Sequence, residues 1–299
     1  MNKRNPNFIP FFFIFLCQRD TMGNTIPEKN YDIEESVFVE SLFVKNDTNR
    51  STIQRFLYHE SCSKSFHIIV KTISMNEKAL KTYNNIIKMI QLHSPLHVVQ
   101  ILHKKQIDRK TMKLYLKDHG CFDLFELKCH AMRRFNKIPS HKCEIYLYQI
   151  ARGIESLHNL GIVHGDIKPE NVVIDSGKTD KAVIIDLDGA SFHSMRSFDE
   201  VHVCAGTKGY VAPERMKNNI LCKANDVWSF GILMFELFEG YLPLGTDYME
   251  TIFKTGVPIL KFDYTPMWLR KTIRKSIRLN HKKRLSMKEI VDVLVIAIL

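Results

Sequence analysis

The chain has 299 residues, of which 43 are lysine or arginine and 32 are aspartate or glutamate, so its formal charge is +11. Hydrophobic residues make up 45% of the chain and charged residues 25%. This composition excludes a collagen, a coiled coil and a wholly disordered chain, because it supplies enough apolar surface for a sizeable core. The length suits about two units of ordinary size, or one large domain of two lobes. The positive charge favours acidic partners such as phosphates, nucleic acid or an anionic surface, without choosing among them.

The first 30 residues are expected to be a poorly ordered, disordered leader outside the fold. An apolar run at residues 8–17 follows Lys3 and Arg4, but it is too short to cross a bilayer, which takes about 20 residues. No transmembrane span is therefore expected. The run resembles the start of a signal peptide without a small-residue cleavage site. A second hypothesis places the start of translation at Met22.

The cysteines bear on the cellular compartment. The 7 cysteines are irregularly spaced and include no C-x-x-C pair, which argues against a zinc ribbon or a thioredoxin-type redox pair. Reduced thiols in an intracellular, cytoplasmic protein are the favoured interpretation. A secretory route, with the apolar run as a signal peptide, is the minority alternative.

Glycine divides the chain into two differently built halves, because residues 24–119 contain none and residues 120–299 contain twelve of the thirteen. Runs rich in β-branched and aromatic residues predict strands in the first half, at residues 36–44, 55–58, 66–70, 97–102 and 111–116. Residues 79–92 repeat apolar side chains with helical spacing. The first half is therefore expected to be a small sheet with one helix.

The second half is expected to be mainly helical. Apolar periodicity predicts helices at residues 141–160, 226–239, 266–280 and 287–298. The second of these is expected to open on Asp226 as its N-cap. Two short strands are expected at 171–174 and 182–185, separated by a turn.

Part of the second half carries the residue types that phosphoryl transfer needs: a group that accepts the proton of the substrate hydroxyl, cations near the transferred phosphate, and metal ligands. Asp166 lies in a loop after a long helix and can accept the proton, and Lys168 can neutralise the transferred group. Asn171 and Asp186 offer hard oxygens that suit Mg²⁺. Asp186 follows an apolar strand, which would hold its carboxylate rigidly.

These residues stand in motifs that resemble those of eukaryotic-type protein kinases, and the resemblance covers residues from about 31 to 299. The segment HGDIKPEN at 164–171 is similar to the family's catalytic loop, with Gly165 in place of an arginine. Lys168, together with Thr207 ahead of the A-P-E at 212–214, resembles serine/threonine rather than tyrosine kinases.

Two motifs further along the chain support the same family. Asp226 is similar to the family's aspartate that braces the catalytic loop, and Arg284 to the arginine that pairs with the glutamate of A-P-E, here Glu214. The resemblance implies an α+β fold of two lobes. A small β-rich N-lobe with one helix would span residues 31–116, and a larger helical C-lobe would span 117–299, after the leader at 1–30.

The first half matches the family less well. Lys71 resembles the strand lysine that holds the α- and β-phosphates, and the alternative is a surface lysine on an edge strand. Its usual glutamate partner is missing, since counting back from the H-S-P at 93–95 places Asn85 there. The glycine-rich loop is also absent, so that a lid over the phosphates is either built from residues 46–51 or missing. Asp123 stands where the family often contacts the ribose, and a cap on the following helix is the equal alternative.

Two further departures concern the metal motif and activation. The motif reads Asp186-Leu187-Asp188, with its glycine displaced to Gly189. Asp186 is favoured as the metal ligand because the predicted strand ends directly before it, and Asp188 is the alternative. Gly165 replaces the arginine that normally receives an activation-loop phosphate, which implies activity without that phosphorylation.

Taken together, the resemblance implies a divergent, compact serine/threonine protein kinase that transfers the γ-phosphoryl group of ATP, with Mg²⁺, to protein hydroxyls. Its trimmed N-lobe and composition are similar in style to kinases of large DNA viruses, which implies the host cytoplasm, or of reduced parasite genomes. The alternative is a pseudokinase scaffold. The implied catalytic residues are Asp166, Lys168 and Thr207, the implied ATP-binding residues are Lys71, Asp123, Asn171 and Asp186, and the implied metal ligands are Asn171 and Asp186.

The expected partners are protein substrates, with acidic ones among the candidates. Nucleic acid is a secondary candidate, and the oligomeric state is not indicated. An acidic protein substrate or a nucleic acid would bind to a basic stripe, a row of lysine and arginine residues that recur with helical spacing. The default interpretation of this stripe is a solvated helix face. The stripe consists of Arg270, Lys271, Arg274, Lys275 and Arg278.

Overall fold

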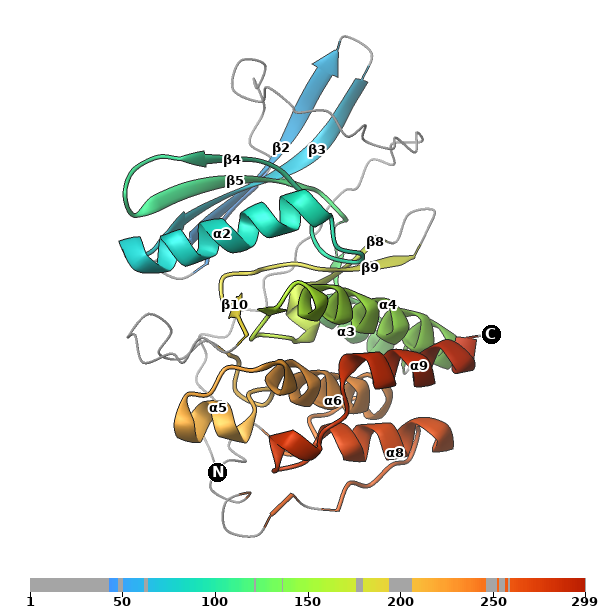
Figure 1. Ribbon diagram of the computed structural model, residues 1–299. Coiled ribbons are helices and arrows are strands. Elements are labelled where there is room, and N and C mark those ends of the chain that lie inside the picture. The colour runs from blue at the N-terminus through green and yellow to red at the C-terminus, as the bar shows by residue number, and fades with distance from the viewer. Residues whose placement is uncertain are drawn as a thin grey trace, which may run out of the picture.

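The structure is a computed structural model with a β-rich upper region and a helical lower region (Figure 1). The residues that it describes are 43–47, 51–61, 64–120, 122–135, 137–175, 180–193, 206–245, 252, 256–257 and 259–298. The expected leader at residues 1–30 lies outside them. This α+β architecture agrees with the fold that the sequence predicts.

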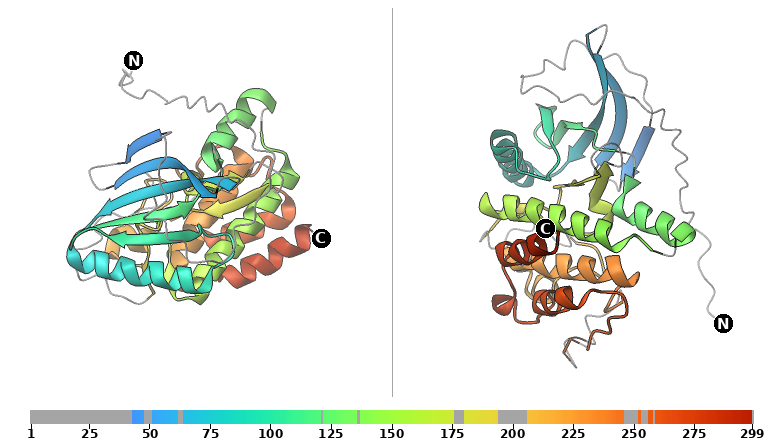
Figure 2. Two further views of the ribbon diagram at one scale, coloured as in Figure 1. Left: turned by 90° about the horizontal axis from the view of Figure 1, so that it is seen from above. Right: turned by 90° about the vertical axis from the view of Figure 1, so that its right-hand side faces the viewer.

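The upper region is a five-stranded antiparallel sheet with the order β1-β2-β3-β5-β4. Its strands are β1 (Phe43–Asp47), β2 (Ser51–Ser61), β3 (Lys64–Ser74), β4 (Ile101–Gln106) and β5 (Thr111–Lys117). Helix α2 (Glu77–His93) runs along one face of the sheet (Figures 1 and 2). The side chain of Asn76 caps this helix by accepting from the amide of Ala79. The apolar stripe that predicts the helix is the side that packs on β3 and β5.

Two predicted strands of this region meet different outcomes. Only residues 43 and 44 of the strand predicted at 36–44 are described, and they belong to β1. The strand predicted at 97–102 is wrong at its start, because β4 begins at Ile101. His97 adopts a positive φ of 55°, and its carbonyl accepts from the amide of Ile184 at 2.8 Å. The start of this segment is therefore hydrogen-bonded to Ile184 of the lower region.

The lower region is built from helices α3 (Leu124–Phe135), α4 (Ser140–Asn159), α5 (Pro213–Asn218), α6 (Lys223–Glu239), α8 (Met267–Ser276) and α9 (Met287–Ile298). Helix α4 lies between the sheet and α6 (Figure 2, right), and α8 and α9 pack on α6 and α4 respectively. Nearly every residue of α6 is buried. A helix that is apolar all round belongs in the core, and α6 forms the centre of this region.

Two helix boundaries also differ from the prediction. Helix α6 begins at Lys223 with Cys222 as its N-cap, so Asp226 lies one turn inside the helix. The cap prediction is wrong because Asn225 closes the capping box and leaves the Asp226 carboxylate for other contacts. The helix predicted at 266–280 ends at Ser276.

Short strands lie between the sheet and the helices. Strands β6 (Phe122–Asp123), β8 (Val172–Asp175) and β9 (Lys181–Ile184) form one small sheet, and β7 (Ile162–Val163) pairs with β10 (Ser191–Phe192). The apolar face of α2 and Leu187, in the loop after β9, belong to one buried cluster. Within the described part of the chain, no helix is both long enough and apolar enough to cross a membrane.

Candidate active site

The loop between β7 and the short 3-10 helix Pro169–Asn171 gathers polar side chains around Asp166. Its Oδ1 accepts from the amide of Thr207 at 2.9 Å and from the hydroxyl at 3.0 Å. Lys168 Nζ lies 3.0 Å from Asp166 Oδ2 and donates to the Thr207 hydroxyl at 2.6 Å. Asn171 Nδ2 donates to the Asp166 carbonyl at 2.8 Å and to Oδ2 at 3.1 Å. The fold thus brings together four residues that the sequence predicts for the site.

Asp226 anchors this loop to helix α6. It is fully buried in α6, and its Oδ1 accepts from the amide of Gly165 at 2.8 Å. Its Oδ2 accepts from the amide of His164 at 2.9 Å and lies 2.8 Å from Nε2 of His158. Burial raises the pKa of Asp226, but the contacts with the two histidines and with the Gly165 amide outweigh it, so the pKa is below its ordinary value. An ionised carboxylate in the helical core therefore fixes the start of the loop.

A second cluster surrounds Lys71 of β3, which is 5% exposed. Its Nζ lies 2.7 Å from Asp186 Oδ1 and 2.8 Å from Asp188 Oδ2. Burial lowers the pKa of Lys71, but the two carboxylates outweigh it, and the pKa is raised. The alternative of a surface lysine on an edge strand is therefore wrong.

The two carboxylates of this cluster titrate differently. Burial raises the pKa of Asp186, but the charge and hydrogen bond of Lys71 bring it down to about 2. Burial also raises the pKa of Asp188, to about 6; Lys71 opposes this rise and the negative charge of Asp186 adds to it. The cluster thus holds one strongly acidic carboxylate beside a weakly acidic one.

The comparisons with known proteins agree with this geometry. The family model described as the protein kinase domain matches residues 59–295. The chain belongs to the protein kinase domain family. It is 25% identical over 209 residues to the maternal embryonic leucine zipper kinase of Xenopus laevis, covering 66% of this chain and 30% of that protein. It is 33% identical over 168 residues to the CBL-interacting serine/threonine-protein kinase 15 of Arabidopsis thaliana, covering 52% and 39%. The chain thus spans less than half the length of both relatives.

The C-terminal part of the kinase domain contains the predicted ion pair. Arg284 donates from Nη1 and Nη2 to the two carboxylate oxygens of Glu214, at 2.7 Å each. Both side chains are buried, and Asn225 Nδ2 also donates to Glu214. The Arg284 guanidinium stacks over Trp228, 4.9 Å from the ring centroid. The predicted pairing of these two residues is observed.

Helix α2 of the kinase domain faces the Lys71 cluster with a residue that the sequence analysis did not identify. Asn85, predicted at the glutamate position, is exposed, so that assignment is wrong. The buried Tyr83 donates its hydroxyl to Asp188 Oδ1 at 3.3 Å. Counting from a downstream motif assumes a fixed spacing, whereas the rotation of α2 on the sheet decides which side chain faces inward. The sequence did indicate an inward-facing Tyr83, because this residue lies on the apolar stripe of the predicted helix.

The residues predicted to bind Mg²⁺ supply suitable oxygens. The Asn171 amide nitrogen donates to Asp166, so its amide oxygen is the atom that it can offer to a cation. The Asn171 carbonyl accepts from the amide of Ile185 at 2.9 Å, which places it beside Asp186. An amide oxygen and a carboxylate fit Mg²⁺, which proteins usually bind with few side chains, waters and substrate phosphates. Among the described residues, no group of three His, Cys, Asp or Glu residues offers a metal site.

The sequence also predicts a ribose contact by Asp123 and a lid over the phosphates, and the structure bears on these two predictions differently. Asp123 Oδ1 accepts from the amide of Glu126 at 2.7 Å, so the alternative of a cap on α3 is observed. A ribose contact by Asp123 stays a prediction. Of the lid predicted at residues 46–51, only residues 46, 47 and 51 are described, and they lie in β1 and β2, where Asp47 pairs with Ser51.

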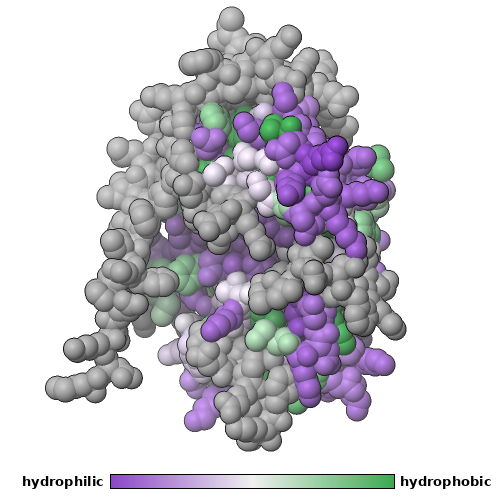
Figure 3. All heavy atoms as spheres, turned by 90° about the vertical axis from the view of Figure 1, so that its left-hand side faces the viewer, coloured by the Kyte–Doolittle hydropathy of each residue, from purple (hydrophilic) through white to green (hydrophobic). Residues whose placement is uncertain are grey.

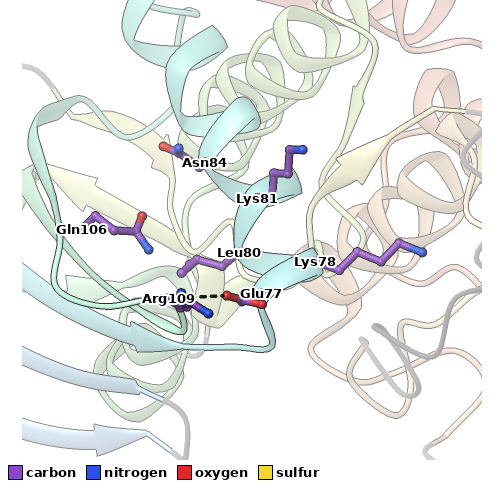
Figure 4. A pocket seen from close by; sticks show the side chains of 7 residues that line it. All are labelled: Glu77, Lys78, Leu80, Lys81, Asn84, Gln106 and Arg109. Atoms are coloured by element: carbon purple, nitrogen blue, oxygen red, sulfur yellow. Dashed lines mark ion pairs between the residues drawn. The ribbon is translucent and has the colours of Figure 1, made fainter.

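A separate pocket of about 520 Å³ lies beside α2 and the β4–β5 hairpin (Figure 4). An ion pair between Glu77 and Arg109, 3.8 Å apart, joins its two sides. The surface on this side of the sheet region is largely hydrophilic (Figure 3). The pocket contains none of the residues of the Asp166 or Lys71 clusters, so it is a different place from the candidate active site. Its lining residues are Glu77, Lys78, Leu80, Lys81, Asn84, Gln106 and Arg109.

Proposed function

We propose that the chain transfers the γ-phosphoryl group of ATP to serine or threonine hydroxyls of proteins, in the presence of Mg²⁺. The observation that carries this proposal is the Asp166 cluster, in which a carboxylate, an ammonium group and a hydroxyl lie within hydrogen-bonding distance of one another. Phosphoryl transfer depends on positioning and charge stabilisation more than on covalent chemistry, and such a cluster supplies both.

Asp166 is the proton acceptor in this proposal. The substrate oxygen forms a bond to the γ-phosphorus, the bond from that phosphorus to the β–γ bridging oxygen breaks, and the hydroxyl proton passes to Asp166. Lys168 neutralises charge on the transferred group while Thr207 keeps the carboxylate oriented. Lys71 binds the non-transferred phosphates from the sheet side. Mg²⁺, when held by Asn171 and Asp186, would neutralise further phosphate charge.

Two observations support specificity for serine and threonine hydroxyls. Lys168 and Thr207 contact each other directly, in the pair of positions by which the sequence resembles serine/threonine kinases. The name of the Arabidopsis relative contains the term serine/threonine-protein kinase. Phosphoamino-acid analysis of a labelled substrate tests this specificity, and phosphotyrosine as the main product would contradict it.

A pseudokinase scaffold is the second candidate function. Two observations favour it: α2 presents Tyr83 rather than a glutamate to the lysine cluster, and no glycine occurs in residues 24–119. The complete Asp166 cluster favours catalysis, because a scaffold has no need of a carboxylate held beside an ammonium group and a hydroxyl. Catalysis is therefore the function that the geometry supports better.

The basic stripe adds little to the proposal. Arg270 donates to the Thr265 carbonyl, and Arg278 donates to the Lys283 carbonyl. Arg274 stacks over Phe262, 4.7 Å from the ring centroid. Since several of these side chains stabilise their own segment, protein substrates remain the proposed partners and nucleic acid stays secondary. An intracellular, cytoplasmic location is likewise a proposal, which cell fractionation tests.

The test of catalysis is transfer of label from γ-labelled ATP to generic acidic and basic proteins, with Mg²⁺. Asp166→Asn should fold normally and lose about 10²–10⁴-fold in rate, the usual contribution of a positioned base. Asp292→Asn, an exposed position on α9, is the matched control and should keep wild-type activity. Transfer at the wild-type rate by Asp166→Asn would remove Asp166 from the mechanism.

A further inference from the structure

Helix α2 contributes no carboxylate to Lys71. Its only acidic residue is Glu77, whose side chain is 60% exposed and pairs with Arg109. The side chain that α2 directs to the cluster is the phenol of Tyr83. A phosphate-binding lysine needs a fixed partner, because its four-carbon stem otherwise leaves the ammonium group free to adopt many positions. The partner must therefore come from another element.

Both carboxylates beside Lys71 come from the loop after β9. Asp186 and Asp188 lie at nearly equal distances from Nζ, 2.7 and 2.8 Å. In the proposed function, Asp186 also holds the metal ion, so its charge is then shared between two cations. A buried ammonium group is costly without a full counter-charge. Asp188 is the carboxylate already in place to provide it.

Asp188 is itself held in position. Its Oδ1 accepts from the Tyr83 hydroxyl at 3.3 Å, while Oδ2 contacts Lys71, so each oxygen has its own partner. Its backbone amide donates to Asp186 Oδ1 at 3.3 Å. The preceding Leu187 is buried in the cluster that α2 forms with the sheet. The carboxylate is therefore tied both to α2 and to its own loop.

We propose that Asp188 is a positioning residue that pairs with Lys71 in place of the missing helix glutamate. It holds the Lys71 ammonium group in position for the phosphates of ATP, and the hydrogen bond from Tyr83 fixes Asp188 relative to α2. The inference rests on the proposed function, in which Lys71 binds phosphate. It also gives a physical role to the displacement of the motif's glycine to Gly189, since a glycine at position 188 would carry no carboxylate.

The test is a double-mutant cycle on nucleotide affinity. ADP is titrated by calorimetry into the full chain and into Asp188→Asn, Lys71→Met and the double variant, first in EDTA and then with Mg²⁺. Asp188→Asn should weaken ADP binding about tenfold in EDTA, as expected for a lost charged hydrogen bond. In the Lys71→Met chain the same change should have no further effect.

Other results would overturn the proposal. An equal loss in both backgrounds would make Asp188 an independent contact, and a loss seen only with Mg²⁺ would make it a metal ligand. Unchanged affinity in Asp188→Asn would remove it from the site. Tyr83→Phe should weaken binding about two- to threefold, while Tyr148→Phe on α4 is the matched control; equal affinities in these two variants would overturn the role of Tyr83.

Unfolding measurements separate this inference from the proposed function. If the wild-type chain binds no ADP, the proposed function fails. The melting temperatures of the same four chains without nucleotide then still test whether Lys71 and Asp188 stabilise each other. Lys71 and Asp188 should then show a coupling of at least about 2 °C. Additive changes in melting temperature would show that Asp188 does not hold Lys71.

Discussion

At the scale of single residues, Gly165 shows how backbone conformation restricts the residue types in the loop that contains Asp166. Its φ is +79°, and a Cβ placed there would lie 2.7 Å from the Gly189 carbonyl oxygen. Two independent reasons thus disfavour a side chain at this position: the left-handed backbone conformation and the close approach of a neighbouring main-chain oxygen. The family's arginine therefore cannot occupy this position unless the loop moves, which is a physical reason for the departure from the motif.

Gly165→Ala should destabilise the chain by more than about 2 kcal/mol and lower the transfer rate, because the backbone penalty of about 1–2 kcal/mol is joined by the steric overlap. Gly161→Ala is the matched control, since Gly161 has a φ of +75° and nothing within 4 Å of its added Cβ. Denaturant unfolding of both variants gives the comparison. Equal free energies of unfolding would contradict the steric argument.

Asp226 makes a prediction about pH. Its pKa is below the ordinary value in the folded chain, so folding is favoured by its ionised form. The stability that it contributes should be complete above about pH 4, the pKa of an unfolded aspartate, and decline as the pH falls further. In Asp226→Asn this part of the pH dependence should be missing from the free energy of unfolding. Parallel curves for wild type and variant between about pH 3 and 6 would refute it.

At the scale of elements, the Glu214–Arg284 pair connects the start of α5 with the segment before α9. Replacing either residue by alanine should cost about 3–5 kcal/mol, because it strands a buried charge. The double variant should lose less than the sum of the single variants. Arg278→Ala, in the same segment but exposed, is the control and should have a small effect. Additive losses in a double-mutant cycle would show that the pair is not coupled.

At the scale of the whole molecule, the two regions meet at the Lys71 cluster, where a lysine of the sheet contacts two aspartates of the lower region. A ligand that binds only the folded chain adds about 2.7 kcal/mol at one hundred times its dissociation constant. Millimolar ATP should therefore raise the melting temperature, and more so with Mg²⁺. In Asp186→Asn the effect of Mg²⁺ should disappear, while Asp292→Asn behaves as wild type. A folded chain without any shift would favour the scaffold.

Much of the Asp166 cluster could be predicted from the sequence, because its members are close along the chain or stand in ordered motifs. Asp166, Lys168 and Asn171 lie within six positions, and a short loop leaves them few ways to be far apart. The helices α2, α4 and α6 were predictable as well, because apolar periodicity reflects the face that each must bury. Their ends were less so, as the Cys222 cap of α6 shows.

Tertiary structure alone decided the partners of Lys71. Asp186 and Asp188 lie 115 and 117 positions after it, and no local pattern specifies which of their oxygens meets the ammonium group. The rotation of α2 on the sheet placed Tyr83 inward and left Asn85 in solvent. Packing also placed Asp226 inside α6 instead of at its N-cap, whereas its contacts with the Asp166 loop agree with the brace that the motif predicts. The sequence determined which chemical groups are available, whereas long-range packing decided which of them meet, because contacts between distant segments depend on the whole core.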